Sequence, residues 1–596
     1  MNTCLRALRV VWILSAAGSL ARAQAPAVRL DVGDPPGATS SFLPEIAASG
    51  TSVYATWEDL RNGLADVYFN RSLDGGATWL ANDVRLDVGD APGAETSAAP
   101  QIAASGASVY VTWEDVRDGR GDIYFNRSLD GGATWLPNDV RLDVSDPPGA
   151  AISTLPRIAC VGASVYVTWQ EFRNGAEDIY FNRSLDGGAT WLALDVRLDT
   201  GDPPGASRSG MPQIAATSAS VYVTYWDARN GSNTDVYFNR SLDGGTTWLP
   251  SDVRLDLGSP PGAAASDAPR IAVDRAAVYV VWQDQRNGLS DIYLNASPNR
   301  GTTWLAADVR LDVGSAPGAV TSDTPEIAAA LPYVYVTWRE GPSIRFNRSL
   351  DSGTTWFAAD IGLNFGVEGV ADPQIATSGI AVYVTWEERV NSVSEIHFNR
   401  SVFRGDPGTW LPLSVRLDTG VGGASLHPQL AASGASIYTA FQSQQSTGNW
   451  DAYFVLALGF QPYGSGTPGS GGIVPTLSGS SHASIGGTLA VDPAKGLGGA
   501  IGVVFAGMNG RASIPIDGGL LLVQPPVLRK TFKLSGMEGM PGVGTTNVGF
   551  AIPNELALIG TRMNFQARIS DPGVTRRTAG GQIGFAFTNG LEAWIL

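Results

Sequence analysis

The sequence predicts an all-β protein: an eight-bladed β-propeller closed by its N-terminal strand, followed by a C-terminal β-sandwich. Three observations predict this fold: a unit of about 56 residues that recurs along most of the chain, four short β-rich runs in each unit, and no helical periodicity. The tetrapeptide Val-Arg-Leu-Asp marks the repeat and begins at Val28, Val84, Val140, Val196, Val253, Val309 and Val415.

The first unit contains the four predicted strands in order. Pro44–Gly50 is a short apolar run that ends in a turn, and 52–57 alternates bulky and small side chains. A third β-rich run covers 66–71, and 79–87 supplies the fourth. Four strands without a helical segment between them are the composition of one propeller blade.

The two ends of the repeat region predict how the ring closes. Eight copies of the first strand occur, but a fourth-type strand at 28–31 precedes all of them, and the last unit stops after its third strand. Pairing the spare first segment with the last unit removes two exposed sheet edges, so a closed ring is favoured over a linear array. The eight first strands start at Pro44, Pro100, Pro156, Pro212, Pro269, Pro325, Pro373 and Pro428.

The N-terminus predicts export. Residues 1–23 combine Arg6 and Arg9, an apolar stretch, and a small-x-small cleavage pattern at Ala21–Ala23, which together are typical of a signal peptide. We therefore expect a secreted protein, extracellular or at the cell surface. No later segment is long and apolar enough to span a bilayer.

The net charge of the chain limits the classes of partner that it can bind. The whole chain carries a formal net charge of −16, and losing the three arginines of the signal peptide takes it to about −19. This charge argues against nucleic acid and anionic membranes as partners, and it is compatible with neutral sugars, cations or basic surfaces. We expect a monomeric propeller whose partner is a glycan or another cell-surface component.

A second motif lies between the third and fourth strands. Ser72–Trp79 has the pattern S-x-D-x-G-x-T-W, in which Asp accepts backbone hydrogen bonds, Gly permits a positive φ, and Trp fills space between sheets. Residue 299 is Asn where the fifth copy should have Asp, the seventh copy is stretched, and the eighth unit has none. The other intact copies are 128–135, 184–191, 241–248 and 349–356.

On this motif the chain resembles the Asp-box (BNR-repeat) propellers of the sialidase superfamily, over residues 27–458. The resemblance implies that the box is a fold element on the side away from the ligand face. Its aspartates, Asp74, Asp130, Asp186, Asp243 and Asp351, are accordingly expected to be structural and not catalytic.

The polar loop after the second strand is the candidate ligand site. In a propeller this loop shares one face with the loop that leads into the next blade, and a ring of carboxylate, guanidinium and aromatic groups there suits a sugar. The alternative is structural: the Asp and Arg pair within one hairpin, and the Trp packs between blades. The candidate residues are Trp57, Asp59, Arg61, Trp113, Asp115, Arg117, Trp169, Glu171, Arg173, Asp227, Arg229, Asp284 and Arg286.

A secreted, non-catalytic propeller that binds a carbohydrate or surface, or acts as a scaffold, is the functional expectation. The alternative is a sialidase-like glycoside hydrolase of the exo-α-sialidase type. The resemblance implies that such an enzyme uses three Arg, a Tyr–Glu pair and an Asp acid from different blades, whereas the Arg, Tyr and Asp here recur in register. We therefore expect no catalytic residues.

Cofactors and metals are not expected. His397, His427 and His482 are scattered along the sequence and predict neither a metal cluster nor a triad. The loop that holds Asp31 and Asp34 could take Ca²⁺ through carboxylates and carbonyls, but its spacing matches no calcium loop and a Pro-Gly turn is favoured.

The repeat ends at Leu458. Residues 459–472 are rich in Gly, Ser and Pro, which predicts a flexible linker. Residues 473–596 alternate short apolar runs with Gly and Pro turns, which predicts a β-sandwich of about eight strands. This last part resembles a C-terminal module that is appended to many secreted bacterial proteins, through the segment Ile552–Gly560 and the ending Thr588–Leu591.

Overall fold

The computed structural model describes residues 27–364, 369–434, 436–458, 460–463, 466–479, 488–508, 510–516, 519–525, 527–552, 562–571, 576–578, 581–583 and 585–594. The predicted signal peptide, residues 1–23, lies outside the described residues. Among the described residues no helix is long and apolar enough to cross a membrane. Their secondary structure is β, apart from the 3-10 turn η1 (Ser470–Gly472).

Residues 28–458 form eight four-stranded antiparallel sheets, the arrangement typical of a β-propeller. Sheets 1 to 4 are β2–β5 (Ser41–Ser49, Ser52–Asp59, Asp66–Ser72, Val84–Arg85), β6–β9 (Ser97–Ser105, Ser108–Asp115, Asp122–Ser128, Val140–Arg141), β10–β13 (Ser153–Val161, Ser164–Glu171, Asp178–Ser184, Val196–Arg197) and β14–β17 (Ser209–Thr217, Ser220–Asp227, Asp235–Ser241, Val253–Arg254).

Sheets 5 to 8 continue the same order along the chain, and the strand β1 at the start of the repeat region belongs to the last of them. They are β18–β21 (Ser266–Asp274, Ala277–Asp284, Asp291–Ser297, Val309–Arg310), β22–β25 (Ser322–Ala330, Tyr333–Glu340, Ser343–Ser349, Ile361–Gly362), β26–β29 (Val370–Ser378, Ala381–Val390, Val393–Ser401, Val415–Arg416) and β30–β32 (Ser425–Ser433, Ser436–Gln444, Trp450–Leu458) with β1 (Val28–Arg29).

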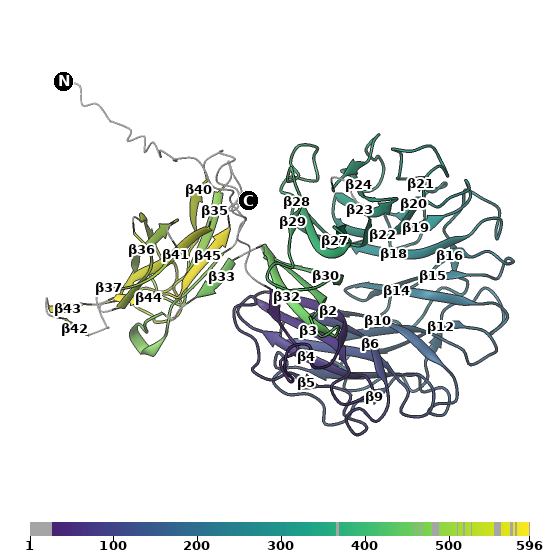
Figure 1. Cartoon of the computed structure of the whole chain (residues 1–596), viewed down its shortest axis with the longest axis horizontal. Coiled ribbons are helices and arrows are strands. Elements are labelled where there is room, and N and C mark those ends of the chain that lie inside the picture. The colour runs from purple at the N-terminus through teal and green to yellow at the C-terminus, as the bar shows by residue number, and fades with distance from the viewer. Residues whose placement is uncertain are drawn as a thin grey trace.

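The first strands of the eight sheets lie side by side in a closed order. Each contacts the first strand of the next sheet, and β30 of sheet 8 contacts β2 of sheet 1. β1 pairs with β32, with Val28 opposite Phe454 and Arg29 opposite Tyr453. Figure 1 accordingly shows the purple start of the repeat region beside its green end.

The cores lie between neighbouring sheets. Phe69 of sheet 1 shares one apolar cluster with Val111 and Trp113 of sheet 2, and equivalent clusters follow along the ring. The tryptophan of each intact S-x-D-x-G-x-T-W turn adds to this packing: Trp135 meets Phe69 edge-on, with ring centroids 4.8 Å apart. Packing across the gaps therefore joins each sheet to the one before it.

The fourth strand is shorter than the sequence predicts. Of residues 79–87 only Val84–Arg85 are a strand, and the segment before them is held in part by the Asn70 side chain. Its Oδ1 accepts the Leu80 N–H at 3.0 Å, and its Nδ2 donates to the Leu30 carbonyl at 3.1 Å. Asn70 thus links its own outer segment to the outer segment of the neighbouring sheet.

The C-terminal region holds two further sheets and two hairpins. Leu489 and Phe550 of the three-stranded sheet share a core with Val504 and Phe565 of the larger sheet. The larger sheet runs β33 (Phe460–Tyr463), β45 (Gly590–Trp594), β41 (Arg562–Ser570), β36 (Ile501–Gly507), β39 (Leu528–Lys533), with β44 (Phe585–Phe587) beside β41; the smaller is β34 (Thr476–Gly479), β35 (Thr488–Ala494), β40 (Val548–Ala551); the hairpins are β37 (Arg511–Ile516) with β38 (Gly519–Val523) and β42 (Arg576–Thr578) with β43 (Gly581–Ile583).

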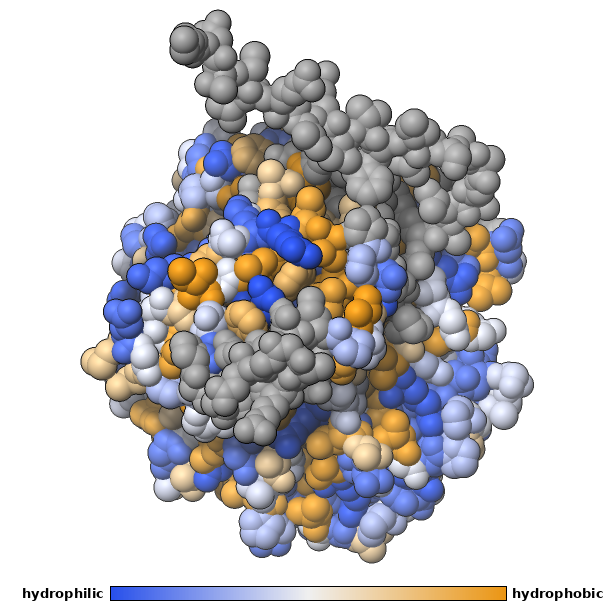
Figure 2. Space-filling model, turned by 90° about the vertical axis from the view of Figure 1, so that its left-hand side faces the viewer, coloured by the Kyte–Doolittle hydropathy of each residue, from blue (hydrophilic) through white to orange (hydrophobic). Residues whose placement is uncertain are grey.

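Residues 460–463 differ from the flexible linker that the sequence predicts for 459–472. They form β33 and pair with β45, so the larger sheet begins directly after the repeat region. Apolar side chains remain at the surface of the C-terminal region, among them Ile501, Leu528 and Met537. On the face shown in Figure 2, orange apolar patches lie beside blue polar ones.

Candidate functional site

The predicted ligand-binding side chains of the first unit bind one another. Trp57 and Asp59 are fully buried, and the Trp57 indole N–H donates to Asp59 Oδ2 at 3.2 Å. Arg61 has about a tenth of its side chain exposed, and its guanidinium binds both Asp59 and Asp83, the latter at 2.6 Å. The same guanidinium lies 4.0 Å above the Tyr68 ring. The charged side chains that were predicted to bind a ligand are therefore paired with one another.

The arrangement recurs in sheets 2 to 5. Each arginine lies about 4 Å above a tyrosine ring and bridges two carboxylates, one at the end of its own second strand and one ahead of the fourth strand. Burial opposes ionisation of Asp115, but the hydrogen bond and charge of Arg117 outweigh it and lower the pKa of Asp115. The groups in sheets 3 to 5 are Arg173 with Glu171 and Asp195, Arg229 with Asp227 and Asp252, and Arg286 with Asp284 and Asp308.

This geometry supports the structural alternative for the thirteen predicted residues. Trp113 and Trp169 are also fully buried, as are the carboxylates at the Asp59 position, including Glu171. The alternation of side chains along a strand does not indicate whether a side chain at the end of the strand faces solvent or packs against the next sheet. The Asp31 and Asp34 loop, for which the sequence favours a Pro-Gly turn over a Ca²⁺ site, is similar, since both carboxylates bind Arg29, each at 2.8 Å.

The turn aspartates lie at the opposite ends of the strands. Asp74 Oδ1 accepts the Thr78 N–H at 2.8 Å, its Oδ2 accepts the Thr78 hydroxyl at 2.6 Å, and the Ser72 hydroxyl donates to it at 2.7 Å. The turn adjoins the hairpin between the first and second strands, because the Gly75 N–H donates to the Thr51 carbonyl.

The residues that differ from sheet to sheet lie on the first strands. The residue after the first-strand proline is Glu45, Gln101, Arg157, Gln213, Arg270, Glu326, Gln374 and Gln429 in turn, and we call these eight the inner ring. Gln101 donates to Glu45 at 3.1 Å, and Arg270 binds Glu326 at 2.6 Å. Enclosure by the strands raises the pKa of Glu45 to about 7, although the Arg157 charge from sheet 3 opposes the rise.

A second set of variable residues lies where the first strands start, and we call it the rim. It comprises the two residues before each first-strand proline and the second-strand residue opposite them, such as Phe42, Leu43 and Glu58 in sheet 1. The first strands bulge here, and Leu43 has φ 47°. The rim adjoins the loop between the second and third strands of the preceding sheet, because the Ser97 N–H at the start of β6 donates to the Ala65 carbonyl at 2.7 Å.

Part of the rim has a structural role that repeats. The Glu58 carboxylate accepts the N–H of the bulge residue of the next sheet, Ala99, at 2.6 Å. Gln170, Gln283, Glu387 and Gln442 make the same bond to Met211, Thr324, His427 and Leu43, at 3.2, 3.2, 2.7 and 2.9 Å. A carboxylate or amide at this position therefore needs no ligand to explain it.

The other rim residues divide into an apolar and a charged side. The apolar side includes a tryptophan, whose ring lies over Gly210: a Cβ on Gly210 would stand 2.5 Å from Trp226. The apolar residues are Phe42, Leu43, Leu155, Met211, Trp226 and Leu426, and the charged ones are Asp267, Asp323, Arg339, Asp372, Glu387 and His427.

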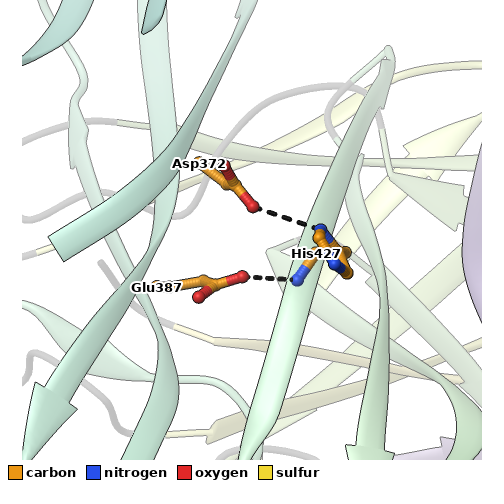
Figure 3. Close-up of side chains that lie close together, drawn as sticks. All are labelled: Asp372, Glu387 and His427. Atoms are coloured by element: carbon orange, nitrogen blue, oxygen red, sulfur yellow. Dashed lines mark hydrogen bonds and ion pairs between the residues drawn. The ribbon is translucent and has the colours of Figure 1, made fainter. Parts of the chain in front are cut away.

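Three charged rim residues from sheets 7 and 8 converge, as Figure 3 shows. His427 Nδ1 lies 3.1 Å from Asp372 Oδ2, and Glu387 accepts the His427 backbone N–H at 2.7 Å. The hydrogen bond to Asp372 raises the pKa of His427, and His427 lowers that of Asp372. Burial raises the pKa of Glu387 to about 7. His427, one of the histidines scattered along the sequence, thus meets two carboxylates distant from it in sequence, because neighbouring sheets meet at the rim.

The sequence holds a signal for these residues that the motif search missed. The first-strand Pro and Ile are nearly constant across the eight units, while the residues on either side of the Pro change from unit to unit. Constant positions serve the packing that every unit shares. Aligning the units column by column therefore locates both the inner ring and the rim.

The fold and the rim define the chain as an all-β propeller with its non-repeating polar residues around one end of the first strands. No family model matches the chain, and no curated protein sequence matches it. Among solved structures it is similar to a PL25 ulvan lyase, with 11% identity over 72% of this chain and 96% of that chain, and a TM-score of 0.40.

Two further solved structures are similar to a comparable extent. The GH93 α-L-arabinofuranosidase of Fusarium graminearum in complex with arabinobiose shares 12% identity over 72% of this chain and 98% of that chain, with a TM-score of 0.35. A Hadza microbial sialidase shares 15% identity over 56% of this chain and 74% of that chain, with a TM-score of 0.32.

Proposed function

We propose that this chain is a secreted, non-catalytic β-propeller that binds a carbohydrate, free or on a surface, at the rim. The single observation that carries the proposal is the contrast between repeated and variable charges. The repeated carboxylate and Arg bind one another in the hairpins of sheets 1 to 5, whereas the variable polar residues gather around one end of the first strands. Variation at one place on a constant scaffold is what a binding site requires.

The two sides of the rim together suit a sugar. A sugar offers an apolar ring face for an aromatic side chain and hydroxyl groups for carboxylates and guanidinium groups. Trp226 is partly exposed on the apolar side, and Arg208 lies 6.0 Å from its ring. On the other side Asp372 and His427 are about 40% exposed, so both are within reach of a ligand.

The finer architecture belongs to the same proposal. Eight blades in one closed ring are supported by the pairing of β1 with β32 and by the contact of β2 with β30. The shared core of the two C-terminal sheets supports a β-sandwich. The Asp74 hydrogen bonds support the resemblance to Asp-box propellers, and residues 1–23 support secretion through a signal peptide.

A sialidase-like glycoside hydrolase is the second candidate, and one observation favours it. Glu387 and Asp372 are neighbours whose pKa values are shifted in opposite directions, as the acid and the charged carboxylate of a glycosidase are. Against it, the rim arginine Arg339 is bound by Asp323 at 2.7 Å. The resemblance implies three arginines free for the substrate carboxylate, which this pairing does not favour.

A glycan array with the full secreted chain tests the binding function. We expect the wild type to bind a defined set of glycans, and Trp226→Glu to lose at least about tenfold in affinity. Sheets 1 and 2 have Glu58 and Glu114 at the position of Trp226. The variant can therefore still accept the backbone N–H of the bulge residue in the next sheet. The matched control Trp79→Phe changes a partly buried tryptophan of the Ser72–Trp79 turn, at the opposite ends of the strands from the rim, and should leave binding unchanged.

The array outcomes separate the alternatives. Absence of binding to every glycan, or binding that Trp226→Glu does not weaken, would remove the rim as a carbohydrate site. A panel of fluorogenic sialosides and other glycosides tests the second candidate in parallel. Turnover that Glu387→Gln abolishes would replace the binding function by the hydrolase.

A further inference from the structure

Asp372, Glu387 and His427 come together in a way that the repeat alone does not explain. Each offers one ligand atom, and these atoms lie within 4.8 Å of one another. They come from β26, β27 and β30, and so from two neighbouring sheets, as Figure 3 shows. Two carboxylates this close repel one another when both are ionised, unless a positive charge lies beside them, either protonated His427 or a metal ion.

The repeat supplies an internal comparison for these three residues. Glu387 accepts a backbone N–H from the next sheet, as Glu58 does in sheet 1, so the scaffold accounts for it. The bulge position occupied by Asp372 and His427 holds Leu43 in sheet 1 and an apolar side chain in sheets 2 to 5. Sheet 6 has Thr324 at this position, and the ionisable residues of sheets 7 and 8, Asp372 and His427, both lie beside Glu387, the carboxylate that the scaffold already provides.

We infer that Asp372, Glu387 and His427 bind a divalent transition-metal cation such as Zn²⁺, Mn²⁺ or Co²⁺. An imidazole with two carboxylates favours these ions over Ca²⁺ and Mg²⁺, which take oxygen ligands almost alone. With metal–ligand bonds of about 2.0–2.2 Å, the donor atoms must lie somewhat closer to one another than the 4.8 Å that bounds their separation in this structure. Asp372 and His427 are about 40% exposed, so small rotations bring their donors in and leave room for water ligands.

The charges around the three residues fit a cation. Metal ligation needs both carboxylates ionised and the imidazole neutral, and in that form the three residues carry a charge of −2, which a divalent ion neutralises. Binding would therefore release the protons that the raised pKa values of His427 and Glu387 favour. The nearest guanidinium, Arg339, binds Asp323 through Nε at 2.7 Å, so its charge is already paired. The ion would join β26 and β27 of sheet 7 to β30 of sheet 8, because its ligands come from both sheets.

Titration of the full-length secreted chain, free of any histidine tag, with Co²⁺ tests the site, since bound Co²⁺ absorbs visible light. We expect saturable binding of one ion per chain, displaced by Zn²⁺. His427→Leu and Asp372→Leu should each weaken binding at least about tenfold. Both variants are expected to fold, because Leu43 and Leu155 hold the same position with φ 47° and 52°, against 45° for Asp372 and 53° for His427.

A second histidine serves as the matched control. His397 also lies near two carboxylates, at 3.6 Å from Glu388 and 3.2 Å from Glu395, but Arg416 already binds Glu395. His397→Tyr introduces the residue that Tyr68 provides in sheet 1 and should leave Co²⁺ binding unchanged. A wild type that binds no Co²⁺ at about 1 mM, or a His427→Leu variant that binds as tightly as the wild type, overturns the inference. Glycan binding is measured separately through Trp226, so either proposal can fail alone.

Discussion

The Arg117 guanidinium binds the Asp139 carboxylate at 2.6 Å, joining the end of a second strand to the segment ahead of a fourth strand. The same guanidinium holds the fully buried Asp115. Because Arg117→Ala leaves that carboxylate buried without a counter-charge, we expect it to lower the free energy of unfolding by about 3 kcal/mol. Urea denaturation followed by circular dichroism measures this loss.

An exposed arginine provides the comparison for Arg117. The Arg208 side chain is 65% exposed and binds Glu177 at 2.8 Å. A solvated pair of this kind contributes little, so Arg208→Ala should change the free energy of unfolding by less than about 1 kcal/mol. Equal losses in the two variants would contradict a structural role for the buried pairs.

The repeat explains why the fold was more predictable than the site. Four strands per unit and the lack of helix between them follow from side-chain periodicity, and both agree with the described residues of the repeat region. The direction in which Asp59 points does not follow, because it depends on the partners that the folded sheet brings to it, Ser41, Trp57 and Arg61. Likewise, nothing local to Asn70 indicates that its amide links Leu80 to Leu30 of the neighbouring sheet. His427 meets Glu387 forty residues away in sequence, and only the arrangement of the sheets brings them together.

Glu45 should make stability fall as the pH rises. Its pKa is raised to about 7 in the folded protein, above the usual value of about 4.3 in an unfolded chain, so folding takes up a proton between these values. The resulting stability is complete below about pH 4 and is lost as the pH passes 7. At pH 8 Glu45→Gln should therefore unfold with a free energy roughly 1 kcal/mol higher than the wild type. Denaturation at pH 5 and pH 8 gives both values.

Glu326 of the inner ring is the opposite case. It binds Arg270 at 2.6 Å, so Glu326→Gln removes a paired charge. This variant should be less stable than the wild type at pH 8, where Glu45→Gln is more stable. Destabilisation by both variants at pH 8 would show that the Glu45 carboxylate is well solvated or paired.

The turn aspartates should tolerate an amide better than a methyl group. Asn299 holds its turn as the aspartates do, since its Oδ1 accepts the Thr303 N–H at 2.8 Å and its amide donates to the Thr303 hydroxyl. Asp130→Asn should therefore keep most of the thermal stability, whereas Asp130→Ala leaves the turn donors to water and should lower the Tm more. Calorimetry of both variants measures the difference, and equal Tm values for the two would refute this account of the turn.

Gly210 should tune the rim through the position of Trp226. Gly210 does not have a positive φ, so Ala is allowed by the backbone, but the added Cβ would stand 2.5 Å from the Trp226 ring and 2.9 Å from Gln170 Oε1, so it must displace the ring and shift the Gln170 amide. If the ring stacks on a sugar, Gly210→Ala should weaken glycan binding several-fold with little change in Tm. Gly369→Ala is the matched control, because its Cβ meets nothing within 4 Å, and its affinity should equal that of the wild type. Unchanged affinity in Gly210→Ala, with a crystal structure showing the ring moved, would mean that Trp226 does not contact the ligand.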